Sequence, residues 1–186
     1  MFMKKIILFG LLPLITTMGM AQNRAYIGGG ISMDMVDIDG INKDFDNGIS
    51  GEAVIGIVTD NKFGGEFKIS NSIVSSEVSD DGDSLEVDTR VISLLGTYSH
   101  QLTNDLVIMP KIGFSNIKAK GTLHEYGGSE SISSSETKLT FGVDAKYRIS
   151  SDANIYAGYT IYNVDDGDFS QLVMGYQQSF NTDLFD

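Results

Sequence analysis

This 186-residue chain lacks cysteine and is poor in positive charge. Because it has no cysteine, disulfide bonds cannot stabilise the fold, so stability must come from pairing between segments of the backbone. Its 13 basic residues are outnumbered by 25 acidic ones, which gives a formal net charge of −12. Nucleic-acid binding needs a basic surface that neutralises phosphates, so this balance argues against nucleic acid as a partner.

Long apolar runs are also scarce, and the only one lies near the N-terminus. Lys4 and Lys5 precede the apolar stretch Ile6–Ile15, and Gly19-Met20-Ala21 supplies small residues after it. This order predicts a signal peptide over residues 1–21 and therefore an exported protein. The alternative is a membrane-anchoring helix, but the stretch is shorter than the ~20 residues of a comfortable span.

The remaining chain shows a period of two, most clearly in Lys138–Arg148. There Leu139, Phe141 and Val143 share one parity with further apolar residues, while polar and charged residues occupy the other. Successive side chains of a strand point to opposite faces, so this segment predicts a strand with one apolar and one charged face. A strand with an apolar outside and a wet, charged inside is typical of a transmembrane β-barrel.

Seven further segments show a similar pattern, which makes eight strands in all. The expected strands are Ala25–Val36, Ile49–Thr59, Phe63–Val74, Leu85–Ser99, Leu106–Lys118, Lys138–Arg148, Ile155–Val164 and Phe169–Phe180. Apart from the last connection, long loops alternate with tight turns, as in bacterial outer-membrane barrels. We therefore predict an all-β fold, an eight-stranded antiparallel up-and-down transmembrane β-barrel over residues 22–186, with both ends of the domain on the tight-turn side.

Two of these strands carry particular expectations. In the fourth, the alternation is ambiguous, and we favour Ile92, Leu94 and Tyr98 on the outside over Val91 and Leu95. In the fifth, Pro110 has no amide hydrogen for the ladder and requires a bulge or an unpaired position.

Three motifs resemble those of the small eight-stranded outer-membrane barrels, namely the OmpX/Ail-like, OmpA-type and opacity-type porin-family proteins. They are Gly28-Gly29-Gly30 in the first strand, Pro110-Lys111-Ile112-Gly113-Phe114 in the fifth, and Met174–Phe180 at the end. The last is similar to the family's C-terminal assembly signal, which implies that Gly175, Tyr176 and Phe180 are recognised by the barrel-assembly machinery. It departs from the family at Gln178, where an apolar residue is usual, and in the six residues that follow Phe180.

The alternation places six charged residues inside the barrel: Glu52, Glu66, Lys68, Lys111, Asp144 and Lys146. Side chains fill the interior of an eight-stranded barrel, and a buried ion needs a partner, so we expect an ion-paired plug. A narrow channel for small solutes is the alternative. Five aromatic residues fall at predicted periplasmic strand ends and are interpreted as an interfacial girdle: Tyr26, Tyr98, Tyr147, Tyr176 and Phe180.

Catalysis, cofactors and a metal site are not expected. Of the two histidines, His124 is followed by Glu125 and Tyr126 and so lacks the His-x-Ser pair of barrel-type lipid A deacylases, and His100 lies at the opposite, periplasmic side. The acidic tips Asp37-x-Asp39-Gly40 and Asp80–Asp83 offer oxygen ligands without the spacing of a calcium loop, so we interpret them as solvated turns. Weak divalent binding shared with lipopolysaccharide phosphates is the alternative.

The combined interpretation is a non-catalytic protein of the Gram-negative outer membrane with a filled lumen. Its expected partners are outer-membrane lipid, lipopolysaccharide and the assembly machinery. Three predicted loops, 37–47, 75–84 and 119–136, would serve envelope integrity or adhesion and could hold a surface receptor. A soluble periplasmic ligand-binding barrel is a further alternative, in which the charged parity would face outward.

Overall fold

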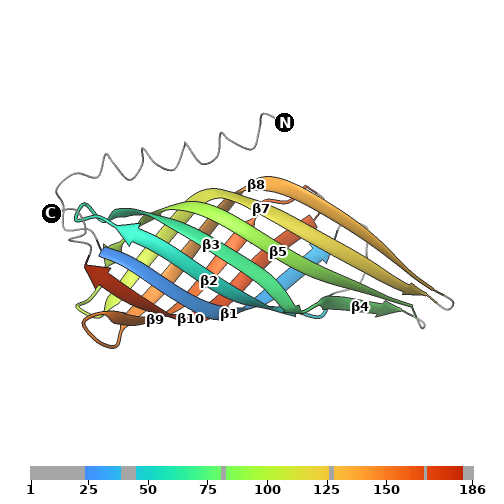
Figure 1. The fold of residues 1–186 in the computed structure, drawn as a ribbon, viewed down its shortest axis with the longest axis horizontal. Coiled ribbons are helices and arrows are strands. Elements are labelled where there is room, and N and C mark those ends of the chain that lie inside the picture. The colour runs from blue at the N-terminus through green and yellow to red at the C-terminus, as the bar shows by residue number, and fades with distance from the viewer. Residues whose placement is uncertain (1–23, 39–44, 81–82, 126–127, 166, 182–186) are drawn as a thin grey trace.

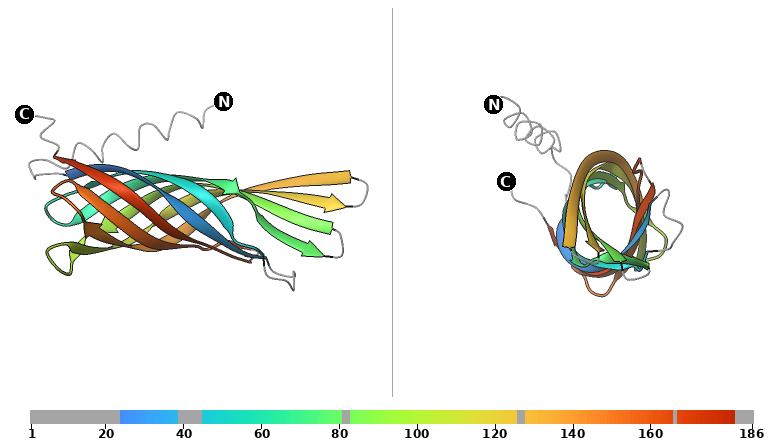
Figure 2. Two further views of the ribbon diagram at one scale, coloured as in Figure 1. Left: turned by 90° about the horizontal axis from the view of Figure 1, so that it is seen from below. Right: turned by 90° about the vertical axis from the view of Figure 1, so that its right-hand side faces the viewer.

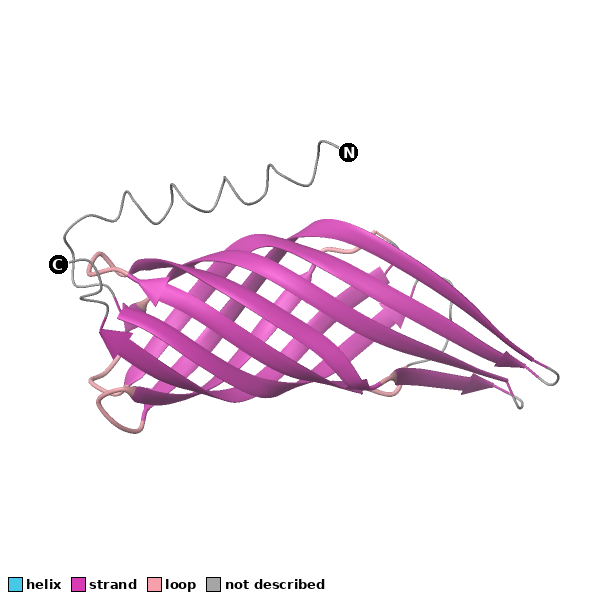
Figure 3. Ribbon diagram, in the orientation of Figure 1, coloured by secondary structure: helices cyan, strands magenta, loops and turns pink. Residues whose placement is uncertain are grey.

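The computed structural model describes residues 24–38, 45–80, 83–125, 128–165 and 167–181 as an all-strand fold (Figures 1 and 3). The predicted signal peptide lies outside these residues, as do Asp39 and Gly40. The strands are β1 (Arg24–Ile38), β2 (Gly48–Val58), β3 (Phe63–Val74), β4 (Ser76–Asp80), β5 (Asp83–Tyr98), β6 (His100–Gln101), β7 (Leu106–Glu125), β8 (Gly128–Arg148), β9 (Ala153–Tyr162) and β10 (Gly167–Asn181). The described part of the chain has no helix long and apolar enough to cross a membrane.

Antiparallel pairing closes these strands into a barrel. The sheet order is β4-β5-β3-β2-β1-β10-β9-β8-β7-β6, and pairing of β5 with β7 closes the ring. β4 is a side branch on β5, and β6 is a short piece that continues the β5 side of β7. Eight strands therefore form the wall, which confirms the predicted fold class, and Figure 2 shows the ring end-on. Arg24 pairs with Asn181, so both ends of the domain lie at one end of the barrel.

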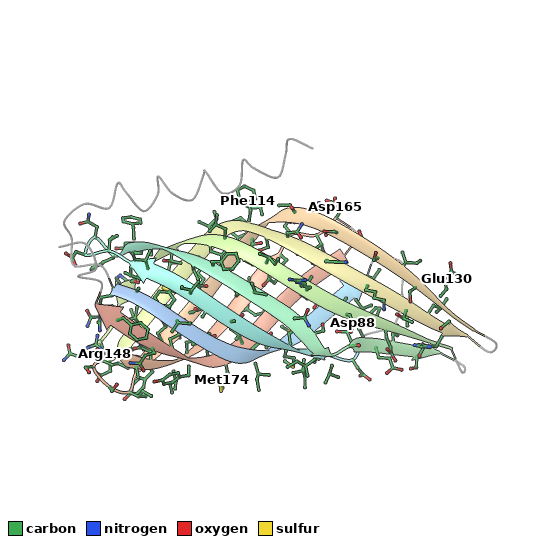
Figure 4. The ribbon with its side chains drawn as sticks, in the orientation of Figure 1. Asp88, Phe114, Glu130, Arg148, Asp165 and Met174 are labelled. Atoms are coloured by element: carbon green, nitrogen blue, oxygen red, sulfur yellow. The ribbon has the colours of Figure 1, made fainter. Side chains whose placement is uncertain are left out.

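The predicted alternation decides which side chains face the interior. Outward residues such as Ile31, Phe114 and Met174 are 63%, 62% and 73% exposed, and Figure 4 shows Phe114 and Met174 pointing away from the wall. In the fourth predicted strand, now β5, Val91 and Leu95 are buried whereas Leu94 is exposed, so the favoured parity was correct.

Pro110 lies where the ladder on one side of β7 is interrupted. Pairing of β5 with β7 ends at Thr97 opposite Lys111, and β6 resumes it at His100 opposite Ile108. A proline cannot donate a ladder hydrogen bond, so the break falls at the position that has no donor to lose.

Two of the three predicted loops are wrong, because strands occupy them. Residues 76–80 form β4, and residues 119–125 and 128–136 continue β7 and β8 in one unbroken register. The strands β5, β7 and β8 thereby extend past the barrel, and with β4 they form a four-stranded sheet beyond its rim (Figures 1 and 2). We call this part the protruding sheet: β4 with residues 83–90, 117–125 and 128–137.

The first predicted loop, 37–47, is only partly described. β1 runs on to Ile38, and residues 39–44 lie outside the described chain. Beyond them Phe45 is buried, and the backbone of Asp46 forms an isolated bridge to Glu77 of β4. This connection is thus tied to the base of the protruding sheet.

Candidate functional site

The barrel interior near the tight-turn end is organised around Lys111. Its Nζ lies 2.6 Å from Glu66 Oε1 and 2.6 Å from Asp144 Oδ2. Tyr26 donates a hydrogen bond to the other oxygen of Glu66 at 2.7 Å, and Lys146 Nζ lies 4.3 Å from the centroid of the Tyr26 ring. Strands that are far apart in sequence thus converge on one cluster that balances two carboxylates with two ammonium groups.

A second polar cluster lies nearer the protruding sheet. Lys68 Nζ is 3.2 Å from Glu52 Oε2, and Tyr156 donates to Glu52 Oε1 at 3.0 Å. Asp34 has no cation within salt-bridge distance among the described residues, and instead accepts hydrogen bonds from the side chains of Ser50, Thr89 and Gln171 at 2.5, 2.8 and 2.8 Å. Neutral donors can stabilise a buried carboxylate in this way.

All six charged residues that the alternation assigned to the interior lie there, and none is more than 8% exposed. Sequence reasoning omitted further members of these clusters, among them Asp34, Tyr156 and Gln171. Asp34 shares the inward parity of β1, which was a usable signal. The roles of Tyr156 and Gln171 depend on contacts across the barrel, which the sequence of one strand does not reveal.

An apolar layer caps the polar interior on the side of the protruding sheet. Val91, Ile117, Tyr162 and Phe169 form a buried hydrophobic cluster, and the rings of Tyr162 and Phe169 stack with centroids 4.8 Å apart. The Tyr162 hydroxyl donates to Gln171 Oε1 at 2.6 Å, which joins this layer to the polar cluster below it.

The predicted position of one of the five girdle aromatics, Tyr26, was wrong. Tyr26 is 5% exposed and lies inside, because it shares the inward parity of β1 and its hydroxyl bonds to Glu66. Tyr147, Tyr176 and Phe180 face outward and are 52%, 45% and 50% exposed. Tyr98 is half-buried, with its ring centroid 5.0 Å from that of Phe63.

The two faces of β7 exchange polarity where the barrel ends. The inner face carries Lys111 within the barrel but Leu123 in the protruding sheet, although both have the same parity. The outer face carries Phe114 within the barrel but Lys120 beyond it, and the change occurs near Asn116. The apolar belt of the outer surface therefore ends there.

The neighbouring strands change polarity at the same height. Arg90 on β5 pairs with Lys118 on β7, and Asn116 pairs with Thr137 on β8. A ring of polar residues thus closes the apolar belt on these three strands. A hydrophobic belt bounded in this way is what a lipid bilayer requires of a barrel.

The described residues offer few groups suited to metal binding or acid–base catalysis. No group of three or more histidine, aspartate and glutamate side chains there could hold a metal ion. His124 Nε2 is 3.7 Å from Glu86 on the exposed face of the protruding sheet, and His100 is exposed on β6.

A closed antiparallel barrel with an apolar belt and a polar interior defines a membrane-spanning β-barrel. The chain belongs to the family of outer membrane protein β-barrel domains, whose model matches residues 7–180. This confirms the family resemblance and makes the chain a member of an outer-membrane family. No curated protein sequence matches it.

Solved structures with the same fold are distant in sequence. Ail, the attachment invasion locus protein of Yersinia pestis, is 19% identical with a TM-score of 0.64, and the match covers 86% of this chain and 99% of Ail. Neisserial surface protein A is 13% identical with a TM-score of 0.62, over 84% of this chain and 97% of that one. OprG of Pseudomonas aeruginosa is 13% identical with a TM-score of 0.60, over 89% and 99%.

Proposed function

We propose that this protein is a non-catalytic outer-membrane anchor whose protruding sheet mediates attachment outside the cell. The observation that carries the proposal is the protruding sheet itself, a hydrogen-bonded extension of β5, β7 and β8 past the apolar belt. A barrel that only sealed the membrane would need strands no longer than the belt.

The outer edge of β8 gives this sheet a means of binding. β8 pairs with β9 only from Thr140 onward, so residues 128–138 present one backbone edge that pairs with no described strand. Such an edge is a template for an added strand, and native proteins leave it open where it serves binding. Ser129–Ser135 keeps this edge polar and soluble.

A closed lumen is part of the proposal. The pairing of Lys111 and Lys68 with buried carboxylates and the apolar layer around Tyr162 and Phe169 both support it. These features disfavour the alternative of a narrow solute channel, because an ion would have to break buried pairs and cross an apolar layer. Planar-bilayer recordings of refolded protein should show no steady single-channel steps, and such steps would overturn a closed lumen.

Export and assembly complete the proposal. Residues 1–21 act as the signal peptide, and Gly175, Tyr176 and Phe180 at the end of β10 are recognised by the barrel-assembly machinery. Tyr147, Tyr176 and Phe180 face outward near the tight-turn end and serve as anchors at the periplasmic interface. The outer belt contacts lipid and lipopolysaccharide.

The chemistry of the attachment partner differs from that of at least one distant relative. Ail has been solved in complex with the heparin analogue sucrose octasulfate. A polyanion of that kind suits this chain poorly, because its formal net charge is −12. We therefore expect attachment to surfaces that are neutral or basic.

Removing half of the protruding sheet tests the function. Lys118 and Ser135 are register partners, so replacing residues 119–134 by Asn-Gly closes β7 and β8 with a two-residue hairpin turn. Cells that produce this variant should lose attachment to protein-coated surfaces. Heat-modifiable gel migration and outer-membrane fractionation check that the barrel still forms, and unchanged attachment by a correctly assembled variant would refute the proposal.

A further inference from the structure

Apolar side chains from all four strands gather on the inner face of the protruding sheet, beside Ser76 and Glu130. Cross-strand partners form one row of Val78, Leu85 and Leu123, and the next row contains Val87, Gly121 and Ile132. Neighbouring apolar side chains on one face of a sheet normally pack against a second layer of structure. The upper part of this face is exposed, as Ile132 shows at 72%, whereas Val87 at its base is buried.

Small residues turn this face into a trough. Gly121 lies on β7 between the larger side chains of Val87 and Ile132, so it forms the floor of the trough. Leu85, Gly121, Leu123, Glu130 and Ile132 line a cavity of about 70 Å³. The trough leads down to a larger cavity of about 260 Å³ at the barrel mouth, whose walls include Ile117 and Phe169 of the apolar layer.

Each cavity carries one glutamate. Glu130 lines the upper cavity and Glu136 the lower one, six residues apart on β8, which corresponds to roughly 20 Å along a strand. The cation beside them, Lys138, is engaged by Glu136 at 3.4 Å and by Asp165. An apolar trough flanked by two carboxylates is complementary to an apolar ligand that carries positive charge at both ends.

We propose that this trough binds an extended apolar peptide segment of a partner protein, flanked by lysine or arginine. The apolar side chains enter the two cavities, and the basic residues reach Glu130 and Glu136. This inference rests on the proposed attachment function and names the partner's chemistry. The acidic chain favours such a partner over an anionic lipid, whose head group the two carboxylates would repel.

Gly121 allows the trough to be filled without disturbing the sheet. A Cβ at this position meets only Leu85 Cδ1, at an ordinary contact distance of 3.6 Å, and Gly121 does not have a positive φ. The variant Gly121→Leu therefore places a side chain in the ligand's space while favouring the strand. Thr122→Leu is the matched control, because it adds an apolar side chain to the opposite face of the same strand.

The test measures fluorescence anisotropy of a labelled heptapeptide, Lys-Leu-Val-Ala-Val-Leu-Lys, with the full barrel in nanodiscs of zwitterionic lipid. We expect Gly121→Leu to weaken binding by about tenfold or more and Thr122→Leu to bind like the parent. Glu130→Lys should also weaken binding. The same peptide with glutamate at both ends should bind at least tenfold more weakly than the lysine form.

Three outcomes would overturn the inference: equal binding by Gly121→Leu and Thr122→Leu, equal binding of the glutamate-ended peptide, or displacement of the peptide by laurate at concentrations that leave the bilayer intact. The last would identify an acyl chain as the occupant. The proposed function is tested separately. If replacing residues 119–134 abolishes attachment and Gly121→Leu does not, attachment stands and the trough is not its binding site.

Discussion

The barrel and the protruding sheet are made from the same strands but have opposite polarity. Within the barrel, β7 turns Lys111 inward and Phe114 outward, whereas beyond the rim it turns Leu123 inward and Lys120 outward. The parity never shifts, because the register with β8 is continuous from Leu106 to Glu125. The surroundings therefore decide which face is apolar: lipid outside the barrel, and water outside the sheet.

The two regions differ in how their inward-facing side chains are accommodated. In the barrel interior, charged side chains pair and polar groups bond to one another, as Lys111, Glu66 and Tyr26 do. The upper part of the inner face of the sheet is exposed, as Ile132 shows, whereas Val87 at its base is buried. The interior of the barrel therefore has partners for its buried charges, whereas part of the inner face of the sheet stays exposed.

The largest expected effect comes from removing the central cation of the barrel. Lys111→Met leaves Glu66 and Asp144 buried without their shared partner, which should lower the free energy of unfolding by about 3–5 kcal/mol. Urea titration of the refolded protein measures it. Lys120→Met, on the exposed outer face of the same strand, is the control and should change stability by less than about 0.5 kcal/mol. Similar losses in both variants would remove the contrast between the two regions.

On the outer face of β7, a lysine substitution should destabilise the barrel but not the protruding sheet. Ile112 and Thr122 share the outward parity of β7, but only Ile112 lies within the apolar belt. Ile112→Lys should cost about 2–4 kcal/mol in a bilayer, because a charge is placed against lipid. Thr122→Lys should be nearly neutral when both are compared by unfolding from lipid vesicles. An equal cost at Thr122 would mean that the belt extends over the protruding sheet.

The inner hydroxyl of Tyr26 tests a position that the sequence-based prediction placed on the outside. Tyr26→Phe removes the hydrogen bond to Glu66 and should cost about 1.5–3 kcal/mol, the range for bonds to charged groups. Tyr147→Phe, with an exposed ring, should have little effect on the same urea titration. If Tyr147 proved the more sensitive of the two, the inward placement of Tyr26 would be contradicted.

Sequence predicted the barrel well because lipid makes the alternation strong. In Lys138–Arg148, apolar residues alternate with polar and charged ones, which suits a strand between lipid and a polar interior. The height of each residue along the barrel axis was harder to predict from the sequence. The sequence predicted that Lys111 faces inward. Its pairing with Glu66 of β3 and Asp144 of β8 depends on how far the strands are staggered around the ring.

The protruding sheet was missed because β8 carries polar residues on both of its faces there. Ser129–Ser135 has the composition of a loop, and its pairing with β7 is visible only in the register. A weak signal existed in Ala119, Gly121 and Leu123, which continue the inward parity of β7 with small or apolar residues. Gly121 weakens that signal, because a glycine in a sequence usually indicates a turn or a bulge.

The smallest expected effects concern two glycines on the inner face of β7. At Gly113, inside the barrel, a Cβ would collide with the carbonyl oxygen of Leu94, whereas at Gly121 it would meet only a leucine methyl at 3.6 Å. Gly113→Ala should therefore cost about 1–3 kcal/mol through forced backbone shifts. Gly121→Ala should be neutral or stabilise by about 0.5–1 kcal/mol, since alanine restricts the unfolded chain. Paired urea titrations decide the matter: equal costs at the two sites would mean that the trough floor is as tightly packed as the barrel, with no space for a ligand side chain.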